Sequence, residues 1–189
     1  MTGSPVSIAP FYAHWATYNR LFVEGIRGLS AAELALRADV ADASTAAHWP
    51  IWAIAAHTAG ARVYWLCVVA GEPGLDHAPF IDASTGMGWE DDLATPRSSA
   101  EVADALEMSW AVVASALGSW APRQLQEGIP VETPVGTRHH TRESILLRLV
   151  THDAYHVGEI ALIQGLHGRP QLDLWPPGVH SVEGDTRNR

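Results

Sequence analysis

Four long segments of this chain repeat apolar residues every three to four positions, the spacing that gathers side chains on one face of an α-helix. The segments cover residues of about 8–29, 50–70, 99–120 and 141–166. Pro50 opens the second segment, Pro122 follows the third, and Ser98-Ser99-Ala100-Glu101 is a capping-box sequence ahead of the third. Since helices bury their apolar faces against one another and little strand pattern competes, the sequence predicts an all-α protein, a four-helix bundle.

The spacing of three to four residues also predicts which residues of each helix face the core. In the first segment, Phe11, Trp15, Tyr18, Phe22 and Leu29 recur on one face. In the third, the buried face is expected to contain Val102, Leu106, Val113 and Ala116. Both sets are therefore predicted to lie in the core.

The connections between the segments are long. Ser30-Ala31-Ala32-Glu33 predicts a short capped helix after the first segment. Residues 72–97 are rich in Gly, Pro, Asp and Thr and have no regular period, and loops of this length are often functional. Within the connection 123–140, residues 129–136 are expected to form a short hairpin. Such connections leave room for a crossover topology.

The length of the chain indicates one domain. At about 150 residues per domain, a chain of 189 residues fits a single unit over 1–189, with a core of about 8–167. The tail, 168–189, contains Leu172, Leu174 and Trp175, which are expected to pack back on the bundle.

Composition excludes several classes of function. An apolar fraction of 47% with 17% charged residues is not that of a disordered chain. No apolar run approaches the roughly 18 residues of a membrane span, and no leader pattern is evident, so we expect a cytoplasmic protein without a membrane partner. The formal charge is −9 and the twelve arginines are scattered, which argues against nucleic acid as a partner. Cys67 lies between Leu66 and Val68 and is expected to be a core residue, because apolar burial raises a thiol's pKa.

The fourth segment carries polar residues in the middle of its apolar face. A helix turns about 100° per residue. Five residues therefore point within about 40° of Ile145, namely Leu149, His152, His156, Glu159 and Ile163. Burying an unpaired polar group costs a few kcal/mol, so two histidines and a glutamate in such a face need partners.

The two histidines have the spacing of a metal site. His152 and His156 are four residues apart, so both imidazoles can converge on one ion. A third ligand is expected from another helix, and His57 in the second segment is the candidate. The face of His57 also carries Ala53, Ala61, Tyr64 and Val68, whose small members leave space for an ion. Three neutral imidazoles with an open position would be typical of a catalytic rather than a structural site.

Other interpretations of these residues stay open. A buried histidine is often a hydrogen-bonded core residue, and most i, i+4 histidine pairs bind no metal. Glu159 fits a fourth ligand, an acceptor that orients an imidazole, a general base, or an edge residue that reaches solvent. Asp153 points about 100° away from His152 and is expected on the surface or behind a ligand. Tyr64 or Tyr155 could bring a phenol to the site.

Two longer stretches of sequence resemble a known family. Trp49-Pro50-Ile51-Trp52-Ala53-Ile54-Ala55-Ala56-His57-Thr58-Ala59-Gly60 and Thr151-His152-Asp153-Ala154-Tyr155-His156-Val157-Gly158-Glu159-Ile160 are similar to motifs of the DinB/YfiT-like superfamily. Residues 12–21 also resemble its first helix, and the resemblance covers about residues 8–167. Many members have Gln where this chain has Glu159, a difference that adds a possible negative charge.

The resemblance implies a fold, a metal and a class of reaction. Members are four-helix bundles of up-down-down-up topology, are commonly homodimers, and bind a divalent metal through three histidines. On this chain those ligands would be His57, His152 and His156, with Zn²⁺ favoured and Ni²⁺, Fe²⁺ or Cu²⁺ as alternatives.

The resemblance also suggests three functions. The first is an enzyme that activates a low-molecular-weight thiol, such as bacillithiol or mycothiol, for S-transfer to an electrophile, with Glu159 as the proton acceptor. The second is a hydrolase that uses metal-bound hydroxide. The third is a non-enzymatic, stress-associated protein whose metal only stabilises the bundle. A substrate screen with and without thiol separates the two enzymes.

Overall fold

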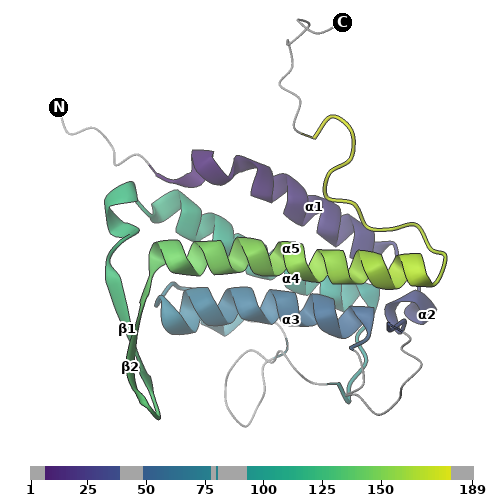
Figure 1. The fold of residues 1–189 in the computed structure, drawn as a ribbon, viewed down its shortest axis with the longest axis horizontal. Coiled ribbons are helices and arrows are strands. Elements are labelled where there is room, and N and C mark those ends of the chain that lie inside the picture. The colour runs from purple at the N-terminus through teal and green to yellow at the C-terminus, as the bar shows by residue number, and fades with distance from the viewer. Residues whose placement is uncertain (1–6, 39–48, 78–79, 81–92, 180–189) are drawn as a thin grey trace, which may run out of the picture.

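A computed structural model describes residues 7–38, 49–77, 80 and 93–179 of the chain. Within these ranges the chain forms four long helices, one short helix and a two-stranded hairpin (Figure 1). The elements are α1 (Ala13–Arg27), α2 (Ala31–Leu34), α3 (Ile51–Val63), α4 (Ser99–Ser119), β1 (Gly128–Thr133), β2 (Gly136–Thr141) and α5 (Arg142–Leu166). The prediction of a helical bundle is confirmed.

The helix starts coincide with the capping sequences. Ser98 accepts a hydrogen bond from the backbone N–H of Glu101, and the Glu101 carboxylate accepts one from the backbone N–H of Ser98 at 2.8 Å. Ser30 and Glu33 form the same reciprocal pair at the start of α2. Thr141 caps α5 by accepting from the N–H of Ser144 at 3.1 Å. Such caps satisfy backbone donors that have no partner inside the helix, so they fix where each helix begins.

Contacts at the two ends of the bundle give its topology. Near the start of α1, the N–H of Ile8 bonds the carbonyl of Trp120, which directly follows α4. At its other end, Arg27 pairs with Asp104 early in α4 at 3.1 Å, so α1 and α4 are antiparallel. Figure 1 shows α3 running alongside α4 in the same direction, and α5 running in the direction of α1. The topology is therefore up-down-down-up.

The core lies between the helices in two main clusters. One cluster joins the end of α1 with the starts of α3 and α4 and the second half of α5. The other joins the start of α1 with the end of α4 and the first half of α5. All four predicted core residues of α4 are buried: Val102, Leu106, Val113 and Ala116. No helix in the described parts of the chain is both long and apolar enough to cross a bilayer.

At two places the chain departs from α-helical geometry, and residues predicted to face inward lie on the surface instead. Residues Ala9–Tyr12 form a 3-10 turn, whose tighter period moves Phe11 away from the core, and Phe11 is 83% exposed. The prediction that Phe11 lies in the core was therefore wrong. After α3 the chain continues as a π-helical turn over Tyr64–Val69, and this wider turn leaves Val68 on the surface instead of the face of His57.

The hairpin is longer than predicted. Strands β1 and β2 pair antiparallel from Gly128–Thr141 to Thr133–Gly136, so His139 and His140 are strand residues. Gly136 has φ +116°, which suits glycine at the tight turn. The strand β2 leads straight into the N-cap of α5 and so sets where that helix begins. Most of the predicted 72–97 loop lies outside the described residues.

Candidate metal centre

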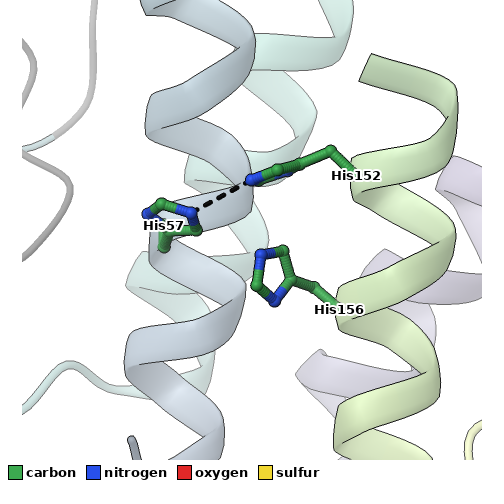
Figure 2. Close-up of side chains that lie close together, drawn as sticks. All are labelled: His57, His152 and His156. Atoms are coloured by element: carbon green, nitrogen blue, oxygen red, sulfur yellow. Dashed lines mark hydrogen bonds between the residues drawn. The ribbon is translucent and has the colours of Figure 1, made fainter. Parts of the chain in front are cut away.

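Three histidines from two helices point toward one another inside the bundle. His57 lies on α3, while His152 and His156 lie one turn apart on α5 (Figure 2). One ring nitrogen from each residue lies within 4.8 Å of the other two. The Nε2 atoms of His57 and His152 are 3.0 Å apart. The three residues selected from the sequence pattern are thus brought together, and each is half-buried.

The spacing and chemistry of these nitrogens fit a divalent cation. Imidazole nitrogens bound about 2.0–2.1 Å from a tetrahedral zinc ion lie about 3.3–3.4 Å from one another. The shortest pair here is slightly closer, at 3.0 Å, and the limit for the whole set is 4.8 Å, so small side-chain rotations suffice. Imidazole is a donor for Zn²⁺, Cu²⁺, Ni²⁺ and Fe²⁺, but a poor choice for Ca²⁺ or Mg²⁺.

His152 is held in the form that a metal requires. Its pKa falls from 6.5 to about 3, chiefly because burial penalises the charged ring, and secondarily because His156, His57, Arg62 and Arg148 repel a proton. Its Nδ1 atom is buried and has no hydrogen-bond partner among the residues that the structure describes. A neutral imidazole has a free lone pair, so protons compete little for this ligand near neutral pH.

This depressed pKa predicts an acid-dependent loss of stability in metal-free protein. Between about pH 6.5 and pH 3 the unfolded chain binds a proton at His152 that the native state does not bind. The free energy of unfolding therefore decreases as the pH is lowered across that window. Replacing His152 with glutamine should flatten this dependence, measured by urea unfolding in chelator at several pH values. Glutamine at the exposed His139 is the control and should keep the wild-type slope. An H152Q slope equal to wild type would contradict a buried neutral imidazole.

Glu159 contacts one of the three histidines. Its Oε2 atom lies 2.9 Å from Nδ1 of His156, and the carboxylate remains 36% exposed. A carboxylate that accepts from Nδ1–H fixes the tautomer in which Nε2 carries the free lone pair. Among the alternatives left open by the sequence, this contact favours an acceptor that orients His156. The convergent set of ligand atoms consists of the three histidines alone among the described residues.

A buried ion pair lies directly behind the histidines. Asp153 is only 6% exposed, so it is not a surface residue, and Arg62 on α3 is 0% exposed. Nη2 of Arg62 donates to Oδ2 of Asp153 at 2.7 Å, and Nη1 donates to Oδ1 of Asn19 at 2.7 Å. Nε1 of Trp15 also donates to Asp153, at 2.8 Å. This pair ties α3 to α5 one residue from His152, so it braces the two helices that carry the ligands.

Sequence reasoning missed Arg62, although a signal was present. Arg62 is the single charged residue between Pro50 and Gly71, within a helix of Ala, Ile and Val. A lone arginine there must either reach solvent or find a buried anion. Asp153, about 100° around α5 from His152, is that anion.

An open groove on one side of α5 reaches His152. Its volume is about 510 Å³, and its lining residues are Ser144, Leu147, Arg148, Thr151, His152 and Tyr155. The guanidinium of Arg148 stacks over the ring of Trp65 at 4.4 Å. In the described part of the chain no carboxylate lies within ion-pair distance of Arg148. The groove therefore gives access to His152 and has in its wall a cation without a carboxylate partner among the described residues.

Two aromatic residues, Trp49 and Tyr155, pack against the histidines. Trp49 packs edge-on against His57, with ring centres 5.1 Å apart. Tyr155 is 71% exposed and its ring lies 5.1 Å from that of His156, whereas Tyr64 packs against Trp65. Cys67 is buried, and burial, followed by the charges of Glu72 and Asp76, raises the pKa of its thiol. As predicted, it is a core residue.

Comparison with known proteins agrees with the helical fold. A crystal structure of a DinB-like protein from Bacillus cereus ATCC 10987 is similar to this fold, with a TM-score of 0.64 and 16% sequence identity. The similarity covers 89% of this chain and 98% of that one, and at this identity it concerns the fold alone. No curated protein matches the chain. The family model of the DinB superfamily matches residues 6–160, and the chain therefore belongs to the DinB superfamily.

Proposed function

We propose that this protein is a divalent-metal-dependent enzyme that activates a low-molecular-weight thiol for transfer to an electrophile. The observation that carries the proposal is the convergence of ring nitrogens from His57, His152 and His156 beside an open groove. A divalent ion held there would lower the pKa of a bound thiol or water. Zn²⁺ is the metal we favour, with Ni²⁺, Fe²⁺ or Cu²⁺ as alternatives. We place the reaction in the cytoplasm, where small thiols stay reduced.

The residues of the chain have separate tasks in this proposal. The thiol loses its proton, its sulfur forms a bond to the electrophilic carbon, and the leaving group departs with the electron pair of the broken bond. Glu159, partly exposed beside His156, is the proposed acceptor for the released proton. The same carboxylate holds the His156 ring in place. Leu147 and Tyr155 in the groove offer apolar contact to the substrate.

Metal analysis and a conjugation assay test the proposal together. Purified protein is analysed for metal, then loaded with Zn²⁺ and assayed with cysteine or glutathione and monobromobimane. We expect metal-dependent conjugation that His156→Ala abolishes, and that Glu159→Gln lowers while the metal is retained. Conjugation that stays faster than the protein-free reaction in H156A or in chelator would overturn it. Cleavage of an ester without thiol would indicate the hydrolase, and stabilisation by metal without any reaction would indicate the non-enzymatic protein.

Arg148 is expected to select substrates with a negative charge. Its guanidinium lies one turn from His152 on the groove wall and has no carboxylate partner among the described residues. A hydrogen bond to a charged group contributes about 1.5–3 kcal/mol. Arg148→Gln should raise KM about tenfold for 3-mercaptopropionate and leave KM for the uncharged 2-mercaptoethanol unchanged. Arg138→Gln on strand β2 is the control. Equal changes for both thiols would contradict this role.

We also propose that the protein is a homodimer. One face of α5 exposes a stripe of large apolar side chains at helical spacing, which is unusual on a monomer. Beyond the groove, its members are Leu162 and Leu166, which are 60% and 59% exposed. Leu162→Glu should halve the mass in light scattering, since it places a charge in the interface, whereas Ala111→Glu on α4 should not. A wild-type monomer, or an L162E dimer as tight as wild type, would contradict the proposal.

A further inference from the structure

A second, more enclosed cavity lies on the side of α5 that faces α1. Its volume is about 110 Å³. The segment after α5 turns back along the bundle beside α1 and α5 (Figure 1) and closes the cavity with Leu174 and Trp175. Leu174 is 8% exposed, and Trp175 stacks on Tyr18 of α1 with ring centres 5.8 Å apart. The cavity is separate from the groove that reaches the histidines.

The walls of this cavity are apolar and largely aromatic. Trp15, Tyr18 and Phe22 of α1 form one side, and Trp175 forms part of the mouth. Val157 of α5, which is 4% exposed, adds an aliphatic surface. Aromatic rings prefer edge-to-face or offset contact with other aromatic rings, so these walls favour a flat ring over an alkyl chain.

The floor is polar and carries unused hydrogen-bonding capacity. Asn19, Arg62 and Asp153 line it, and each is at most 6% exposed. The Oδ1 atom of Asn19 accepts from Arg62, while its amide nitrogen makes no hydrogen bond to any residue that the structure describes. Oδ2 of Asp153 accepts from Trp15 and from two nitrogens of Arg62. Among the described residues, Oδ1 accepts only from Nε of Arg62, at 3.2 Å. The floor thus offers one donor and one acceptor.

Charge and size narrow the class of ligand. Arg62 and Asp153 neutralise each other, so a charged ligand would be buried without a counter-ion. A dry apolar cavity of about 150 Å³ binds benzene, and the cavity here is smaller, at about 110 Å³, so it takes no more than a single ring. Water can bond to the floor, but the apolar walls give it no partners.

We propose that this cavity is a binding site for a small, uncharged aromatic molecule of one ring with a hydroxyl group. The hydroxyl donates to Oδ1 of Asp153 and accepts from the amide of Asn19, and the ring packs between α1 and Trp175. This site does not depend on the metal centre or on the proposed thiol chemistry.

Phenol is the probe, and the full chain is the protein. Phenol is titrated against ¹⁵N-labelled protein, and the indole N–H signal of Trp15, which bonds Asp153 at the floor, is followed by NMR. Saturable binding of phenol at least tenfold tighter than that of toluene is expected. The larger 1-naphthol should not shift the signal. Absence of saturable phenol binding, or equal affinity for toluene, would overturn the proposal.

A blocking variant and a matched control locate the binding. Ala154 lines the cavity from an exposed position on α5, so Ala154→Phe should cover the mouth without disturbing the core and lower phenol affinity at least tenfold. Ala114→Phe makes the same change on an exposed position of α4 and should leave the affinity unchanged. Circular dichroism verifies that both variants are folded. Equal phenol affinity in A154F and A114F would place the binding elsewhere and overturn the assignment.

Discussion

Replacing Arg62 with methionine is expected to lower the free energy of unfolding by about 3–5 kcal/mol. The change leaves the carboxylate of Asp153, which is 6% exposed, without its cation in a medium of low dielectric constant. It also removes the partner of Asn19 Oδ1. Urea unfolding followed by circular dichroism measures the loss, and a fall in melting temperature of about 10 °C should accompany it.

A surface arginine is the matched control for this loss. Arg27 pairs with Asp104 and Glu107 but is 48% exposed, so Arg27→Met should cost about 1 kcal/mol or less. The double variant Arg62→Met, Asp153→Leu should recover part of the stability, because no buried charge is left. Its recovery will be incomplete, since the indole N–H of Trp15 loses its acceptor. A Met substitution at Arg62 as mild as that at Arg27 would show that burial of the pair contributes little.

Zinc is expected to stabilise the wild-type protein by about 2.7 kcal/mol at a concentration one hundred times its Kd. His156→Ala should abolish this stabilisation at the same zinc concentration, because two imidazoles remain of three. Thermal unfolding with and without zinc, after dialysis against chelator, measures the difference. His139→Ala, on the exposed strand β2, should respond to zinc like wild type.

Substitutions of Glu159, which contacts His156, are expected to lower the zinc affinity by different amounts. Glu159→Ala removes the acceptor that orients the ring, so zinc affinity should fall about 10- to 100-fold. Glu159→Gln keeps an oxygen that accepts from Nδ1–H and should retain most of the affinity. Unchanged stabilisation by zinc in H156A would exclude this histidine as a ligand, and an E159A affinity equal to wild type would remove Glu159 from the support of the site.

The sequence pattern was sufficient for the bundle because each helix has its own local signals. Capping boxes at Ser98 and Ser30 and the period of Val102, Leu106, Val113 and Ala116 act over a few residues, and all are found in the structure. The failures are also local. A one-turn change to 3-10 geometry exposes Phe11, and a π-helical turn exposes Val68, and neither change has a strong signature in apolar spacing.

Prediction of the site was partial for a different reason. The apolar face of α5 contains His152 and His156, which are polar and therefore needed partners. The small residues around His57 indicated space for an ion. The partner of Asp153 could not be found by the same reasoning, since it depends on the rotation of α3 against α5. That rotation places Arg62 opposite Asp153. It is set by how the two helices pack and cannot be read from the spacing of residues along one helix.

The distribution of the three imidazoles along the chain has a consequence for how the protein folds. His57 and His152 are 95 residues apart, so a large loop must close before they meet. During synthesis the complete trio exists only after the last long helix has left the ribosome. A metal ion bound by the three histidines would therefore act on the finished bundle and slow its opening, and would not nucleate its formation.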